Sequence, residues 1–303
     1  AGLVMNYVSL ALLLLAAVLS GLVDRLSLPD FYLGALGGAT ATLIAFFAYV
    51  LGTYEIIPIS PADFAFIVAG GIVALLPSRT LISAMEDVLS GFPVTGTARL
   101  FAVMLHTFGL IVGVAAGLAA TAAVATRLGL NLEPPPIGRM AWASGSPPLV
   151  ILGAALVGMA AAVTAQSRRR MLLPSAALST LTVGVAWLLD ARGFDRITSA
   201  ALAAVVLGFV GRYVSLRLTA PPVVLTSPAS LGLMPGLSIL VALQRLTVER
   251  TESAVQLGTH GMFTALGVLM AVATGTVLGS VLASPLDTWV QNRSRRGREA
   301  RRT

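Results

Sequence analysis

Two short segments with a central proline interrupt the most apolar parts of the chain: Leu75-Leu76-Pro77-Ser78-Arg79 and Leu233-Met234-Pro235-Gly236-Leu237. Proline inside a helix removes one backbone hydrogen bond and clashes with the preceding turn. In a bilayer, the freed backbone groups are tolerated only where they are buried in protein or line a cavity. Either proline alone could be a simple kink. Two matched breaks in two halves are typical of secondary transporters, whose site lies where the halves meet.

The composition identifies an integral membrane protein. Hydrophobic residues make up 56% of the 303 residues and charged residues 11%, whereas soluble domains carry about 25% charged residues. There is no cysteine, which excludes disulfides and thiol chemistry. The net charge of +7 comes from arginines in loops and the tail, where the positive-inside rule predicts them, so we do not expect a nucleic-acid partner. Enzyme, metal and cofactor motifs are absent from the sequence.

Hydropathy predicts an all-α fold with about nine transmembrane helices, because a bilayer core needs about 20 apolar residues per span. The predicted spans are residues 3–22, 31–51, 62–89 (broken at Pro77), 100–125, 148–165, 171–189, 197–216, 223–246 (broken at Pro235) and 257–283. Arginines in the tail and in the 168–170 loop fall on one side, which places the C-terminus in the cytoplasm. Residue 1 then faces outside, so we expect a further span before it.

The predicted organisation is a first transmembrane half over residues 1–126, an external linker over 127–147, a second half over 148–285 and a basic cytoplasmic tail over 286–303. Pro235 follows Pro77 by 158 residues, while His260 follows His106 by 154. Five crossings separate the two broken spans, and an odd number inverts the second copy. We therefore predict two inverted-topology repeats, although pairing of such short patterns can arise by chance.

Several side chains near the breaks could carry transport chemistry. A half-helix that starts at Pro77 or Pro235 would direct free N–H groups at a substrate carboxylate. Arg79 could bind an anion or serve as a positive-inside anchor. Asp87 could pair with a substrate ammonium group or carry a proton, while Glu86 suits the interface. His106 and His260 could carry a coupling proton, or they could be packing residues.

Three motifs resemble the bacterial threonine/serine exporter family. They are Asp87 with Gly91-Phe92-Pro93-Val94-Thr95-Gly96-Thr97-Ala98-Arg99, then Leu28-Pro29-Asp30-Phe31-Tyr32, and then the second break. The resemblance implies a ten-span inner-membrane exporter with a cytoplasmic N-terminal domain, driven by the proton motive force. As part of our own site hypothesis, we expect Thr95 to help line the entrance. The family often has small residues where this chain has Pro77-Ser78-Arg79. The extra arginine would favour a second carboxylate.

Together these features predict a non-enzymatic exporter of threonine, serine or similar small amino acids in the bacterial inner membrane, with protons and lipid as partners. A dicarboxylate exporter and a non-transporting membrane anchor are the alternatives, and a homo-oligomer is open. The expected substrate-binding residues are Pro77, Ser78, Arg79, Asp87, Thr95, Pro235, Gly236 and Ser238. The proton-coupling candidates are His106, His260 and Asp87.

Overall fold

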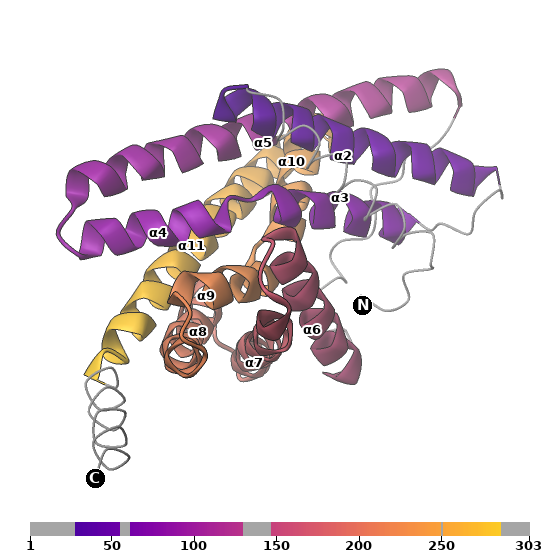
Figure 1. Cartoon of the computed structure of the whole chain (residues 1–303). Helices are drawn as coiled ribbons and strands as arrows, with labels where there is room; N and C mark the ends of the chain where they lie inside the picture. The colour runs from indigo at the N-terminus through magenta and orange to yellow at the C-terminus, as the bar shows by residue number, and fades with distance from the viewer. Residues whose placement is uncertain (1–27, 55–60, 130–146, 250, 286–303) are drawn as a thin grey trace, which may run out of the picture. The chain divides into compact units, whose positions relative to one another are not determined.

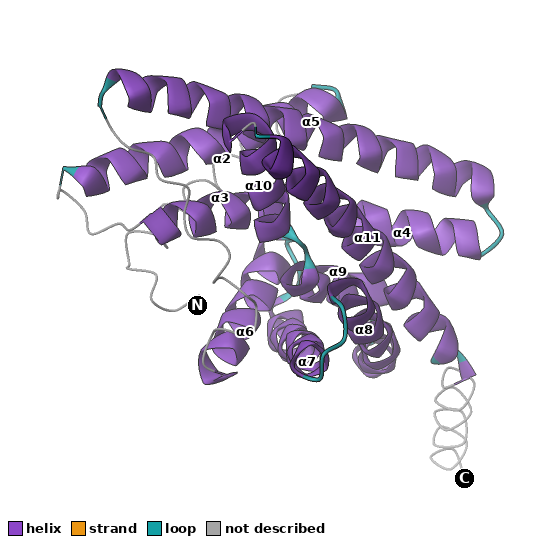
Figure 2. Cartoon of the chain, turned by 180° about the vertical axis from the view of Figure 1, so that it is seen from behind, coloured by secondary structure: helices purple, strands orange, loops and turns teal. Residues whose placement is uncertain are grey.

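A computed structural model describes residues 28–54, 61–129, 147–249 and 251–285, and this part of the chain contains helices and no strand (Figures 1 and 2). The helices are α2 (Asp30–Thr53), α3 (Pro61–Leu75), α4 (Ser78–Leu89), α5 (Pro93–Arg127), α6 (Pro147–Thr164), η3 (Arg169–Met171), α7 (Leu172–Ala191), α8 (Arg196–Leu218), α9 (Pro222–Ser230), η4 (Leu231–Leu233), α10 (Gly236–Gln244), η5 (Arg245–Glu249) and α11 (Glu252–Leu282). The all-α prediction is confirmed for these residues.

Within the described residues, six helices are long and apolar enough to cross a membrane, and a seventh span results if the bent pair Pro222–Leu233 and Gly236–Glu249 counts as one. Ile67–Leu89 counts as a single span despite its break, whereas the second broken span bends by 41°. Val150–Thr164 is a shorter apolar helix. The predicted span 3–22, most of the predicted linker and the predicted tail lie outside the described residues.

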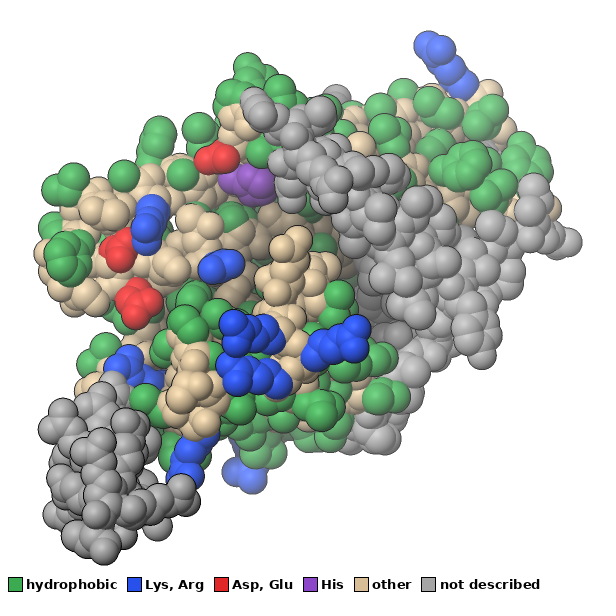
Figure 3. All heavy atoms as spheres, in the orientation of Figure 1, with side chains coloured by type: hydrophobic (Ala, Val, Ile, Leu, Met, Phe, Trp, Pro, Cys, Tyr) green, Lys and Arg blue, Asp and Glu red, His purple; other side chains and the backbone are tan. Residues whose placement is uncertain are grey.

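Large apolar side chains are exposed along these helices, as lipid contact requires. Phe47, Phe101 and Phe263 are 62%, 65% and 75% exposed. Hydrophobic side chains cover wide areas of the face in Figure 3, and charged side chains occur there in small groups. Because water would make such a surface costly, the exposed phenylalanines support the membrane assignment.

The chain divides into two compact units. The first unit comprises Ala1–Thr80, Thr97–Leu149 and Met234–Leu269, and the second comprises Leu81–Gly96, Val150–Leu233 and Met270–Thr303. Each unit therefore combines segments from both halves of the sequence. The boundaries predicted at 126, 147 and 285 are not tested by this division and stay predictions.

Glycines bring helix backbones into contact in the first unit. A Cβ built on Gly113 of α5 would lie 2.0 Å from the Ala35 carbonyl oxygen of α2, and one on Gly109 would lie 2.0 Å from that of Phe31. A Cβ built on Gly38 of α2 would lie 2.6 Å from the Leu110 carbonyl oxygen of α5. Small residues allow this approach, which replaces hydrophobic driving force in lipid. The α2–α5 contact is thus set by backbone shape.

The second unit packs α7, α8 and α9 around one apolar cluster. Its buried members are Met171, Leu178, Leu207, Leu225 and Ala229. Glycines also appear where α8 meets the end of α11: a Cβ on Gly279 would lie 2.0 Å from the Val205 carbonyl oxygen. The long helices α2 with α5, and α8 with α11, therefore use the same type of contact.

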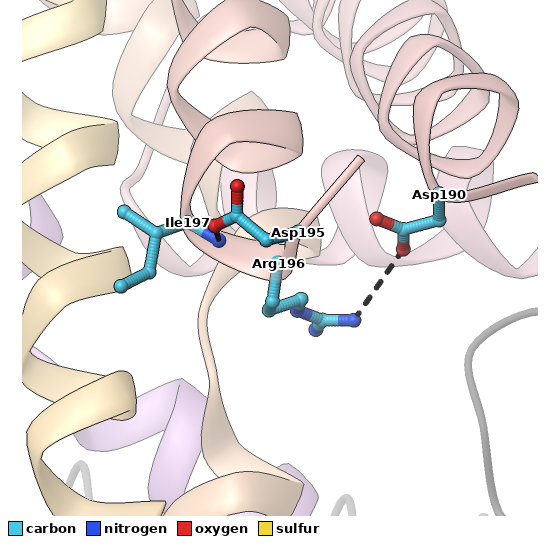
Figure 4. Close-up of polar contacts among 4 residues, drawn as sticks. All are labelled: Asp190, Asp195, Arg196 and Ile197. Carbon is cyan, nitrogen blue, oxygen red and sulfur yellow. Dashed lines mark hydrogen bonds and ion pairs between the residues drawn. The ribbon is translucent and has the colours of Figure 1, made fainter. Parts of the chain in front are cut away.

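The turn between α7 and α8 is fixed by charged side chains (Figure 4). Asp195 caps α8, since its Oδ2 accepts from the backbone N–H of Ile197 at 3.1 Å and of Thr198 at 3.2 Å. The Thr198 hydroxyl donates to Oδ1 of the same carboxylate. Nη1 of Arg196 lies 3.8 Å from Oδ2 of Asp190 at the end of α7. These contacts end one span and begin the next.

Gly113→Ala should destabilise the fold, because its new methyl group would overlap the backbone of α2. Overpacking of this kind costs about 1–3 kcal/mol. Gly184→Ala is the matched control, since no heavy atom lies within 4 Å of its Cβ position. Melting in detergent, followed by fluorescence-detected size exclusion, should show a lower midpoint for Gly113→Ala only. Equal midpoints would contradict the close α2–α5 contact.

Asp195→Ala should lower the melting temperature at pH 7, and the difference from wild type should shrink on acidification. The hydrogen bond from the Thr198 side chain, followed by that from its backbone, lowers the pKa of Asp195. A lowered folded-state pKa adds stability above the unfolded value of about 3.9, which is lost as pH falls through the folded pKa.

Melting scans from pH 7 to pH 3 test this effect, with Asp195→Asn as the control because asparagine also caps helices. The difference in melting temperature between Asp195→Asn and Asp195→Ala should stay constant with pH. A wild-type advantage over Ala that is undiminished at pH 3 would exclude the charged cap.

Candidate functional site

Both proline breaks contain the same three-residue turn. The Ser78 N–H donates to the Leu76 carbonyl across Pro77 at 2.7 Å, and the Gly236 N–H donates to the Met234 carbonyl across Pro235 at 3.0 Å. Pro235 has φ −86° and ψ 46°, close to an inverse γ-turn. Each break therefore supplies one internal hydrogen bond for the backbone groups that the proline releases.

The second break starts a helix whose first turn is buried and has no side-chain cap. Pro235 and Gly236 are buried, and Pro235, at the N-cap position, provides no side-chain cap. The Pro235 carbonyl begins the helical ladder by accepting from the Ile239 N–H at 3.0 Å. The first N–H groups of a helix have no partner within it and carry partial positive charge. This terminus can therefore hold an anion.

Helix α10 crosses α3 at its first residue, within the first unit (Figure 1). A Cβ on Gly236 would lie 2.4 Å from Val73 Cγ2 and 2.5 Å from the Ala69 carbonyl oxygen. Glycine is required because the α3 backbone occupies that space. Gly236→Val would therefore disturb this packing as well as any substrate contact.

The first break starts α4 differently. Ser78 is buried, Pro77 is half-buried and Arg79 is exposed. The His106 ring of α5 lies beside this break, with Nε2 3.0 Å from the Leu75 carbonyl oxygen. The sequence predicts a proton-carrying or packing role for His106 and does not indicate this contact, because a carbonyl released by a distant proline leaves no signal in the sequence around the histidine.

The remaining predicted residues lie on the helices that follow each break. Asp87 is half-buried near the end of α4, and Thr95 is exposed in the first turn of α5. Ser238 is half-buried in the first turn of α10. His260 is exposed on α11. The first unit thus contains both breaks, Ser238 and both histidines, while Asp87 and Thr95 belong to the second unit.

A glycine joins each post-break helix to the next long helix. A Cβ on Gly96 of α5 would lie 2.8 Å from the Ala84 carbonyl oxygen and 2.4 Å from Val88 Cγ2. A Cβ on Gly258 of α11 would lie 3.0 Å from the Ala242 carbonyl oxygen and 2.8 Å from Leu246 Cγ. The two glycines make equivalent contacts, each about a helical turn or two after the start of its helix.

No group of three or more histidine, aspartate or glutamate side chains could hold a metal ion among the residues that the structure describes. Backbone N–H groups, the Ser78 and Ser238 hydroxyls and the Arg79 guanidinium lie at the breaks. Such groups can bind a small polar anion.

Comparisons with known proteins match both halves of the chain. The family model "Putative threonine/serine exporter" matches residues 2–121, and the model "Threonine/Serine exporter, ThrE" matches residues 150–282. A "Probable threonine/serine exporter" of Mycobacterium tuberculosis is 32% identical over 287 residues, which are 90% of this chain and 51% of that protein. A "Threonine/serine exporter" of Corynebacterium glutamicum is 28% identical over 260 residues, 86% of this chain and 50% of that protein.

The chain thus spans about half the length of the curated relatives it matches. No solved structure matches it. The family resemblance predicted from the 87–99 segment and the second break is confirmed, and with it a multi-pass membrane protein of a bacterial exporter family. Two family models that cover both halves, and a relative 32% identical over 90% of the chain, place this protein in the threonine/serine exporter family.

Proposed function

We propose that this chain is the transmembrane part of a secondary transporter that exports threonine, serine or similar small amino acids across the bacterial inner membrane. One observation carries the proposal beyond family membership: the buried, uncapped N-terminus of α10 crosses α3 close to a second break of the same local form. Broken helices whose termini meet inside a membrane protein are where transporters bind charged substrates.

The substrate carboxylate would bind the first turns of α4 and α10. The N–H groups of Ser78 and Gly236 already donate within their γ-turns, so the expected donors shift to residues 79–80 and 237–238. The Ser238 hydroxyl would add a further polar contact. Asp87 lies about 10 Å further along α4 than Thr80, so it would meet the substrate ammonium group at the entrance, which Thr95 would help to line. Each half-helix dipole would favour the carboxylate.

We also propose that the two halves are inverted repeats. The matched γ-turns support this relation, as do the matched glycine contacts. Ala84 and Ala242 keep the 158-residue spacing of the two prolines, whereas Gly96 and Gly258 are 162 residues apart. The spacing of 162 differs from the 154 residues that separate the two histidines, and it would pair His106 with the buried Val268 in place of His260. The glycine contacts thus favour an insertion of four residues in the second half, whereas the histidine spacing predicts a deletion of four.

Export would be driven by the proton motive force, with the C-terminus in the cytoplasm. One charge that crosses a potential of about 150 mV gains about 3.5 kcal/mol, enough for a several-hundred-fold gradient. Asp87 and His260 are the proposed proton carriers. Arg168, Arg169 and Arg170 precede or begin the short helix before α7, and a cytoplasmic location would satisfy the positive-inside rule.

Counterflow in proteoliposomes of the full-length protein tests the function. Vesicles preloaded with threonine should accumulate labelled threonine or serine, and vesicles without protein should not. Uptake of succinate alone would instead support a dicarboxylate exporter, and Arg79→Ala should then abolish it because the exposed guanidinium follows the first break. Exchange of none of the three would favour a non-transporting membrane module and contradict the proposal.

Asp87→Asn should reduce threonine export by about 100-fold, as expected when a charge-assisted contact to a buried substrate is lost, with normal membrane insertion. Glu86→Gln is the matched control, because this neighbouring carboxylate is exposed where Asp87 is half-buried. Export by inverted vesicles and the yield of folded protein measure the two effects. Near-normal flux in Asp87→Asn would remove this residue from the site.

A further inference from the structure

The break at Pro77 releases the carbonyl group of Leu75, the last residue of α3. In an uninterrupted helix, this oxygen would accept from the N–H four residues later. The chain instead turns at Leu76-Pro77-Ser78, where the Ser78 N–H donates to Leu76. A carbonyl without a donor is costly inside a membrane, because no water replaces the lost bond.

His106 supplies the missing donor from α5. Its Nε2 lies 3.0 Å from the Leu75 oxygen, and the ring is half-buried. A carbonyl oxygen only accepts hydrogen bonds, so Nε2 must carry the proton in this contact. Neutral histidine then holds its proton on Nε2 and keeps Nδ1 as the acceptor.

Backbone contacts between α5 and α2 fix the position of His106 relative to α2. A Cβ on Gly34 of α2 would lie 2.2 Å from the His106 carbonyl oxygen, and one on Gly109 would lie 2.0 Å from the Phe31 carbonyl oxygen. Helix α5 therefore cannot slide along α2 without a clash. The Leu75 side chain also contacts α2, since its Cδ1 lies 2.9 Å from a Cβ on Gly37.

Leu75 is therefore held by two helices, through its side chain by α2 and through its carbonyl group by α5. We propose that His106 is a positioning residue for the first break: its Nε2–H bond to Leu75 sets where α3 ends and α4 begins, and it does not carry the coupling proton. This inference rests on the proposed transport function, because the break is the proposed substrate site.

The other histidine provides a natural contrast. His260 is exposed, and its side chain forms no hydrogen bond with any residue in the described ranges. The Thr264 hydroxyl donates to the backbone carbonyl of His260 at 2.9 Å. The same substitutions at the two histidines should therefore have different effects.

The decisive comparison is His106→Gln against His106→Leu. Glutamine places an amide N–H near the Nε2 position but cannot titrate, whereas leucine fills a similar volume without a donor. We expect export by the Gln variant within about threefold of wild type, with an unchanged pH profile, and by the Leu variant about tenfold or more lower, the scale of one lost hydrogen bond. His260→Gln and His260→Leu should instead lose export to the same extent, because neither side chain can carry the proton proposed for His260.

A Gln variant as inactive as Leu, or one whose export loses its pH dependence, would overturn the proposal and make His106 a proton carrier. A fully active Leu variant would show that the hydrogen bond is dispensable. A second measurement does not depend on transport or on the fold of any variant. In ¹⁵N-histidine NMR of the wild-type protein at pH 8, His106 should show a protonated Nε2 and a bare Nδ1; the opposite tautomer would refute the contact even if no exchange is ever observed.

Discussion

The bilayer core contains no water to hydrogen-bond the backbone, so each helix break must be satisfied by the protein itself. This constraint explains the main features around Pro77 and Pro235. Each break forms a γ-turn that pairs one N–H with one carbonyl. The first break uses His106 for a second carbonyl, while the second has a buried N-terminus without a side-chain cap.

Glycine contacts determine how the broken helices pack against their neighbours. Without a hydrophobic driving force between helices in lipid, association depends on close contact and hydrogen bonds. Gly236 lets α10 reach the α3 backbone, and the glycines of α2 and α5 fix the helix that carries His106. The residues that shape the proposed site are thus held by backbone contacts on neighbouring helices, and few of them are charged.

The two halves share their architecture and differ in detail. Both contain a long helix, a broken span with a γ-turn and a second long helix with a glycine against the post-break segment. The first break continues as one span, and the second bends by 41° and is followed by the π-helix η5. Only the first break has a histidine at its released carbonyl.

The sequence by itself determined the membrane class, both breaks and most ends of the described helices to within a few residues, because hydropathy and proline act locally along the chain. The largest difference is at α5, which begins at Pro93 where residue 100 is predicted. The 87–99 segment and the second break also indicated the family. Only the tertiary structure decided that α10 crosses α3 at Gly236, that Gly96 and Gly258 make equivalent contacts, and that His106 donates to Leu75. The contacts of Gly236 and His106 join residues far apart in the chain, and the partners in all these contacts are mostly backbone atoms, which are alike in every residue and leave no pattern in the sequence.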